Sequence, residues 1–195
     1  MSSIVTITEP TSMALTVKEA KDHLRVPGNA DDVYIAGLVD TAIKNVEHRT
    51  GFKLMSQTVE MRINGFPNKK TLSLETGKVT SVTSVKYDDT DDTEQTWAAT
   101  NYWEDVISKE ASITHKDTVW PNTERGKPSS VRIRFVAGWT DHHDVPAHFK
   151  TAIKLLVGSW YNNREEVITG TIVTTLPVGV DAILTGNLEY MIYVL

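Results

Sequence analysis

Apolar side chains recur with helical spacing in two separate stretches of the chain. In residues 31–50 and again in residues 146–165, they fall at i, i+3, i+4, i+7, i+8 and i+11, which is one face of a helix. Matching stripes predict that the two helices pack against each other. The stripe residues are Ile35, Leu38, Val39, Ala42, Ile43 and Val46 in the first stretch and Phe149, Ala152, Ile153, Leu156, Val157 and Trp160 in the second.

Start and stop signals add a third, shorter helix over residues 16–26. Thr16 and Glu19 have the spacing of a capping box, in which each side chain satisfies the other residue's backbone N–H. Pro27 and Gly28 end this helix. Pro146 is expected at the first position of the last helix, where its missing N–H costs nothing.

The period changes to two in the middle of the chain, where Val59, Met61 and Ile63 alternate with polar residues as in a half-buried strand. Further strands are expected at residues 71–74, 81–87 and 131–135, and the aromatic residues between 94 and 119 suggest short strands without clear boundaries. The pattern predicts an α+β protein, a helical layer built from both ends of the chain with a small antiparallel β-domain inserted between them. The expected parts are residues 1–55 (N-terminal helical part), 56–140 (inserted β-domain), 141–185 (C-terminal helical part) and 186–195 (an apolar tail).

Composition is compatible with this fold and narrows the possible chemistry. The chain has 195 residues, 40% of them hydrophobic, which is enough for one large domain or two small ones. It has no cysteine, which excludes disulfides, thiolate zinc sites, iron–sulfur clusters and a cysteine nucleophile.

Charge argues against nucleic acid as a tightly bound partner, because the net charge of −5 mildly repels phosphates. The first basic residue is Lys18, so the positive segment of a secretory signal is missing. The longest uninterrupted apolar stretch, residues 190–195, is far shorter than the ~20 residues of a membrane-spanning helix. We therefore expect a soluble protein with no membrane partner.

Two clusters of polar residues have a possible metal chemistry and a more ordinary interpretation. The acidic run of residues 88–94 lacks the spacing and central glycine of a calcium loop, so a solvated turn between strands is favoured. His142 and His143 lie between Asp141 and Asp144, but adjacent side chains are expected to diverge, so a polar loop that caps the next helix is favoured.

No motif indicates an enzyme. The chain has no Gly-x-Ser-x-Gly elbow, no glycine-rich phosphate loop and no His-Glu-x-x-His, so no catalytic, metal or cofactor residue is assigned and no cofactor is expected. A metal-dependent hydrolase built on His142 and His143 stays as an alternative of another class. The tryptophans at positions 120, 139 and 160 are interpreted mainly as core residues, with exposed ones as possible anchors for a partner.

The C-terminal segment is β-prone and almost uncharged. Such a segment either adds a strand to its own sheet or docks on another subunit, because it is an aggregation hazard when free in water. Both alternatives are open from the residues alone. The apolar residues concerned are Leu188, Tyr190, Met191, Ile192, Tyr193, Val194 and Leu195.

The order of these segments resembles the head–tail connector, or adaptor, proteins of tailed double-stranded DNA bacteriophages. The resemblance covers most of the chain, and only the apolar end departs from the polar, arginine-containing finish of the family. The segments that carry it are residues 15–26, Asp31–Asp32 through Thr50–Gly51, residues 81–88, Trp120–Pro121, residues 131–139, Val145–Pro146, Ala152–Ile153, Trp160–Tyr161 with Arg164, and residues 176–184.

The resemblance implies a structural subunit without catalysis. Its family forms a ring of about twelve copies beneath the portal at the capsid vertex, in the neck of a virion, from protein made in the host cytoplasm. The implied partners are the portal protein, neck or tail-completion proteins and further copies of the chain, while DNA passes through the channel without specific binding. The alternative is a neck or tail-completion protein that binds the tail tube and not the portal.

For such a subunit, the helix faces opposite the apolar stripes are the expected contact surfaces, together with the apolar tail. A merely solvated face is the competing interpretation of the same residues. The helix residues concerned are Lys44, Glu47, Lys150, Lys154 and Arg164.

Overall fold

The computed structural model describes residues 2–107, 110–116, 119–124, 126–164 and 179–185. The chain forms two compact units. Among the described residues, the sheet unit combines residues 2–11 with those of 51–139, and the helical unit combines residues 12–50 with residues 140–164 and 179–185. The expected α+β fold class is confirmed.

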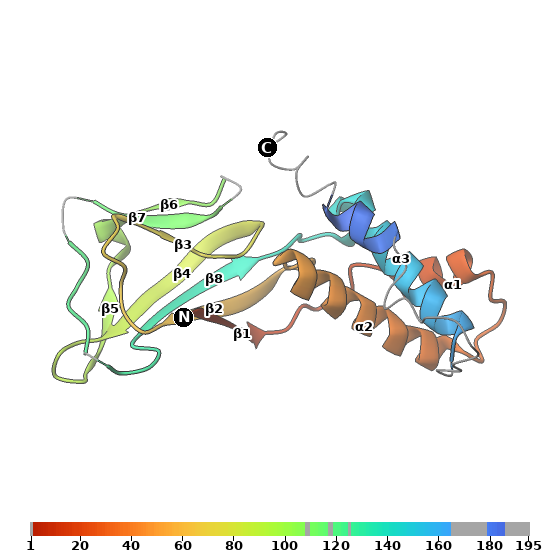
Figure 1. Ribbon diagram of the computed structural model, residues 1–195, viewed down its shortest axis with the longest axis horizontal. Coiled ribbons are helices and arrows are strands. Elements are labelled where there is room, and N and C mark those ends of the chain that lie inside the picture. The colour runs from red at the N-terminus through yellow and green to blue at the C-terminus, as the bar shows by residue number, and fades with distance from the viewer. Residues whose placement is uncertain (1, 108–109, 117–118, 125, 165–178, 186–195) are drawn as a thin grey trace. The chain divides into compact units, whose positions relative to one another are not determined.

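The helical unit contains three long helices, coloured from orange to blue in Figure 1. They are α1 (Val17–Leu24), α2 (Asp32–Thr50) and α3 (Ala147–Asn162), with the 3₁₀ turn η2 (His142–Asp144) before α3 and a short helix over residues 179–185. Helix α2 packs against α3, and α1 contacts both. The predicted stripes form this contact: the buried residues are Ile35, Val39, Ala42 and Val46 on α2 and Phe149, Ala152, Ile153, Leu156 and Val157 on α3.

Local capping signals define the helix ends. Thr16 and Glu19 form the predicted capping box at the start of α1, with the Glu19 N–H donating to the Thr16 hydroxyl at 3.1 Å. Pro146 was predicted at the first helical position of α3 but is its N-cap. Its ψ of 138° is extended, so the helix begins at Ala147. Its carbonyl still accepts from the N–H of Phe149 at 3.0 Å.

Two antiparallel sheets make up the sheet unit. The five-stranded sheet has the order β1–β2–β8–β4–β5, and the three-stranded sheet has the order β3–β7–β6. Strand β8 is central, with Phe135 paired to Val59 of β2 and Val82 of β4. The strands are β1 (Ser2–Thr8), β2 (Gln57–Ile63), β3 (Thr71–Ser73), β4 (Val79–Asp88), β5 (Glu94–Trp97), β6 (Tyr102–Asp105), β7 (Ser112–His115) and β8 (Val131–Ala137), with the 3₁₀ turn η1 (Ala99–Asn101) before β6.

The main core of this unit lies between the two sheets, which face each other in Figure 1. Alternate residues of β2 and β8 point into it, and Leu72 and Ile113 of the smaller sheet complete it. Its fully buried members include Val59, Met61, Ile133 and Phe135.

Strand β1 is the main difference from the sequence analysis, which placed residues 1–55 in the helical part. Residues 2–8 pair with β2, with Ile4 opposite Met61 and Val5 opposite Glu60. Its apolar residues stand at positions 4, 5 and 7 and do not alternate regularly with polar ones, so the period-two signal is weak. Pairing with β2, more than fifty residues away in sequence, stabilises this strand.

Gly138 allows a close approach of two backbone segments at the end of the sheet. Its φ is +106°, and a Cβ there would lie 2.3 Å from the carbonyl oxygen of Met55. The next residue, Trp139, forms an isolated bridge with Met55 and accepts from the N–H of Ser56 at 2.9 Å. Only glycine fits this conformation without strain.

Candidate interface surfaces

The charged residues expected on the exposed helix faces differ in how far they are buried or paired within the chain. Lys44 pairs with Asp40 at 2.8 Å along α2, with 69% of its side chain exposed. Lys150 is only 14% exposed, because its ammonium group lies 3.3 Å from a Glu19 carboxylate oxygen. Glu47 and Lys154 are half-buried. Of these four residues, Lys44 is the most accessible to a partner.

Glu19 joins two helices through its carboxylate. One oxygen accepts from the backbone N–H of Thr16 at 2.9 Å, and the other faces Lys150 on α3. Burial alone raises the pKa of Glu19, but the Thr16 hydrogen bonds and the Lys150 ammonium outweigh it and lower this pKa from 4.5 to about 2. The capping residue of α1 is therefore also an ionic link to α3.

Acid should weaken this link, and the variant Glu19→Gln should reveal it. Because the folded-state pKa lies below the ordinary value, the ionised carboxylate contributes stability above about pH 4.5 and loses it as the pH falls towards 2. We expect Glu19→Gln to unfold at a lower temperature than the parent at pH 7, and the difference to shrink by about pH 3.

The matched control for this measurement is Asp22→Asn, which removes an exposed carboxylate from the same helix. Asp22 pairs with Lys18 at 3.8 Å, and both side chains are more than two-thirds exposed, 69% and 88%. Exposed pairs contribute little to stability. If the difference in unfolding temperature between Glu19→Gln and the parent stayed constant from pH 7 down to about pH 3, this result would contradict the ionic role of Glu19.

Arg164 lies in a cluster that connects the end of α3 with the start of α2. Its guanidinium stacks over the rings of Tyr34 and Tyr161, with its carbon 4.7 and 4.8 Å from the two centroids, and pairs with Asp31 at 3.1 Å. The hydrogen bond from the Tyr161 hydroxyl, followed by the Arg164 charge, lowers the pKa of Asp31. Half of the Arg164 side chain, 51%, stays exposed.

The predicted apolar tail, Leu188 and residues 190–195, lies outside the described residues. The short helix of residues 179–185 lies before it in the chain. It buries Val180 and Leu184, and its Asp181 carboxylate pairs with Arg49 of α2. The sequence analysis did not anticipate this ion pair, since Arg49 and Asp181 are far apart in the chain.

The acidic run forms the turn between β4 and β5, as predicted, but its first member is not solvated. Asp88 has a side chain only 4% exposed, with Arg132 at 3.0 Å and Lys127 at 2.7 Å. Hydrogen bonds from these two cations hold the pKa of Asp88 well below its usual range. Asp91 and Asp92 remain exposed at the tip of the turn.

The face of the five-stranded sheet that points away from the core carries a second set of ion pairs. Glu60 on β2 is held between Arg62 and Arg134, at 2.9 and 2.8 Å. Its side chain is 6% exposed, while the two arginines are about 40% exposed, 40% and 42%. The sequence signal for this face was the alternation of arginines with apolar residues in β8.

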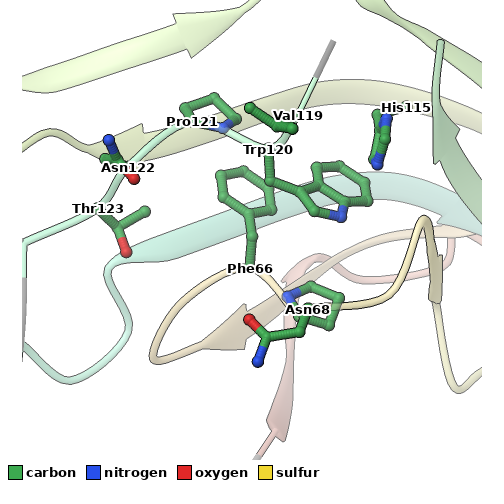
Figure 2. A pocket seen from close by; sticks show the side chains of 9 residues that line it. Phe66, Asn68, His115, Val119, Trp120, Pro121, Asn122 and Thr123 are labelled. Atoms are coloured by element: carbon green, nitrogen blue, oxygen red, sulfur yellow. The ribbon is translucent and has the colours of Figure 1, made fainter. Parts of the chain in front are cut away.

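An aromatic pocket lies at one end of the sheet unit, with a volume of about 410 Å³. Figure 2 shows Phe66 and Trp120 side by side in it; their rings stack at 4.8 Å with an interplanar angle of 8°. The indole N–H of Trp120 donates to the carbonyl of Lys69 at 2.7 Å, which fixes the ring. The described lining is mainly aromatic, with two asparagine amides and His115, which suits a binding surface. The lining residues are Phe66, Pro67, Asn68, His115, Val119, Trp120, Pro121, Asn122 and Thr123.

His142 and His143 lie closer together than the sequence analysis expected. In η2 their ring centroids are 3.9 Å apart, and potential ligand atoms of Asp141, His142 and His143 all lie within 4.8 Å of one another. The divergence expected for adjacent side chains was wrong here, because a tight 3₁₀ turn brings them together. Asp141 accepts from the N–H of His143 at 2.8 Å and so caps η2. The expected cap on the next helix was wrong, because the N-cap of α3 is Pro146, which makes no side-chain cap hydrogen bond.

Comparisons with known proteins agree with a structural, interface-forming chain. The sequence profile of a family described as "Phage gp6-like head-tail connector protein" matches residues 14–111 and 123–187. A search of curated proteins finds no match. None of the described helices is both long enough and apolar enough to cross a bilayer.

Solved structures share the fold. A chain from the "Neck of empty GTA particle computed with C6 symmetry" is 24% identical, with 94% of both chains covered and a TM-score of 0.76. A chain from the "Neck of native GTA particle computed with C12 symmetry" is 23% identical, with 94% of this chain and 93% of that chain covered and a TM-score of 0.74. A third, at 24% identity and a TM-score of 0.75, comes from the virion of a native gene transfer agent particle.

The two-unit α+β fold and its family match define a structural component of a phage-type particle. This chain belongs to the phage gp6-like head–tail connector family, and its role is that of a connector or adaptor.

Proposed function

We propose that this protein forms a homo-oligomeric ring of about twelve copies in the neck of a virion, beneath the portal protein, and joins it to neck or tail-completion proteins. The observation that carries the proposal is the family match together with a fold shared over 94% of the chain with a neck protein. The C6 and C12 symmetries of the related necks support a cyclic assembly. Synthesis in the host cytoplasm precedes assembly into the particle.

The contact surfaces proposed are the exposed sides of α2 and α3 and the apolar tail. Lys44 and Arg164 offer the most accessible cations, while Glu47, Lys150 and Lys154 lie at the margins of the same helix faces. The tail residues, Leu188 and residues 190–195, supply apolar surface whose burial drives association.

The negative charge of the proposed ring keeps DNA from binding to it. At −5 per chain, about twelve copies produce a strongly negative assembly whose field repels phosphates. The genome would then slide through the channel without adhering.

The test is the mass of the purified protein, alone and mixed with portal protein from the same particle, measured by light scattering and electron microscopy. We expect a ring on the portal and a weaker ring with the charge-reversing variant Lys44→Glu. Its control is Lys18→Glu, at an 88% exposed position of α1. Association with tail-tube protein and not with portal would support the alternative, a tail-completion protein, and binding to neither would overturn the proposal.

A further inference from the structure

The described residues contain four strands at sheet edges, and one of them lacks the usual protection. Strands β3, β5 and β6 are three or four residues long, and β5 and β6 carry acidic residues. Strand β1 has seven residues, SSIVTIT, without a charge or a proline. Exposed edges of this kind recruit further strands, so natural proteins shorten or charge them unless they are paired.

Both faces of β1 carry apolar side chains that an added strand could cover. Ile4 points to the core between the sheets, where it is partly buried. Val5 lies on the opposite face, beside Glu60, and is 40% exposed. Ile7, at the register irregularity, is also 40% exposed. The register with β2 is regular from Ser2 to Thr6, and its irregularity falls only at the last residues. A strand added along this edge would cover apolar surface on both faces.

We propose that the free edge of β1 receives residues 188–195 of a neighbouring copy as an antiparallel or parallel sixth strand. This inference rests on the proposed ring and deepens it by naming the contact that links the copies. The donor segment, LEYMIYVL, has one charge and consists otherwise of β-prone or apolar residues. Main-chain hydrogen bonds would supply affinity, and the alternating side chains would supply register.

The symmetry of a ring favours this donor over a second copy of β1. Pairing of β1 with β1 is isologous and closes at a dimer, whereas donation of one segment to a different edge is heterologous and can continue around a ring. The chain thus contains an edge without a partner strand among the described residues and a strand-prone segment without an assigned edge.

Disulfide mapping can test the contact directly, because the chain has no cysteine of its own. Val5→Cys protein would be mixed with protein carrying Tyr190→Cys, Met191→Cys, Ile192→Cys, Tyr193→Cys or Val194→Cys, assembled on portal and oxidised. Opposed residues of neighbouring strands come within disulfide distance. We expect cross-linked pairs whose yield alternates with a period of two along the donor segment, because successive side chains point to opposite faces.

The matched control replaces the acceptor with Gln95→Cys on the protected edge strand β5. Its cross-linking yield should be lower by about tenfold or more. Equal yields from both acceptors, or yields without alternation, would overturn the proposed pairing. A disulfide that forms only within one chain, when both cysteines are placed in it, would assign the segment to its own β1 and also overturn it.

A second experiment measures ring formation on portal directly, in case the cysteine variants fail to assemble. Val5→Lys places a charge on the exposed side of β1 and is expected to reduce ring formation about as strongly as deletion of residues 188–195, whereas Gln95→Lys leaves it unchanged. Rings of normal mass on portal from both the deletion and Val5→Lys would overturn the inference while the proposed function stands. Failure of the parent protein to join portal would overturn both.

Discussion

Phe135→Ala is expected to lower the free energy of unfolding of the sheet unit by about 3–5 kcal/mol. Phe135 is fully buried at the centre of β8, paired with Val59 and Val82 on the two neighbouring strands. Removing the ring takes away its buried apolar area and leaves a cavity between two sheets that cannot collapse freely. Urea unfolding followed by circular dichroism measures the loss, and hydrogen exchange resolved by segment locates it in β2, β4 and β8.

The control is Phe135→Leu, which keeps most of the volume and is expected to cost less than about 2 kcal/mol. A similar cost for both substitutions would contradict the cavity argument. So would reduced protection in α2 and α3 before the sheet, because Phe135 belongs to the core of the sheet unit.

Arg132→Met is expected to cost about 3 kcal/mol, the lower end of what breaking a buried ion pair costs. The substitution leaves the Asp88 carboxylate, 4% exposed, without the guanidinium that lies 3.0 Å away. Lys127 still faces Asp88 at 2.7 Å, which is why the loss falls at the lower end. The cost should fall in acid, because the lowered pKa of Asp88 means that its ionised form contributes stability at neutral pH and loses it below about pH 4.

A double-mutant cycle with Asp88→Asn isolates the pair. We expect the double variant to be more stable than the sum of the single losses predicts, because neither charge is then left buried alone. Lys86→Met is the control on the same sheet: Lys86 and Glu94 are 43% and 49% exposed, so its loss should stay below about 1 kcal/mol. Additive single losses, or a Lys86→Met loss equal to that of Arg132→Met, would contradict this account.

The candidate surfaces show how far residue types predict a binding role. Lys150 and Arg164 have the same charge, and the sequence placed both on the exposed side of the last helix. Lys150 is 14% exposed against Glu19, whereas Arg164, two residues beyond the end of α3, is 51% exposed over two tyrosine rings. Which basic residue is free for a partner depends on what the neighbouring helix places opposite it. Lys44 pairs with Asp40 of its own helix, and 69% of its side chain stays exposed.

The sequence by itself determined the helices and their inward faces. Capping by Thr16 and Glu19 and the stripes of α2 and α3 are local, because they depend on residues within a few positions of one another. It also determined the central strands β2 and β8, whose alternation is regular, and the family to which the chain belongs.

Tertiary structure decided the features that depend on distant partners. Strand β1 forms because it pairs with the edge of β2, and its own hydrophobic pattern is too weak to predict a strand. Asp88 looks like one of several solvated acids in the chain, but the register of β4 against β8 places Arg132 beside it and buries it. Adjacent histidines converge because η2 is a 3₁₀ turn. For β1 and Asp88 the deciding energy comes from a contact between distant segments, and no local window of sequence contains both sides of that contact.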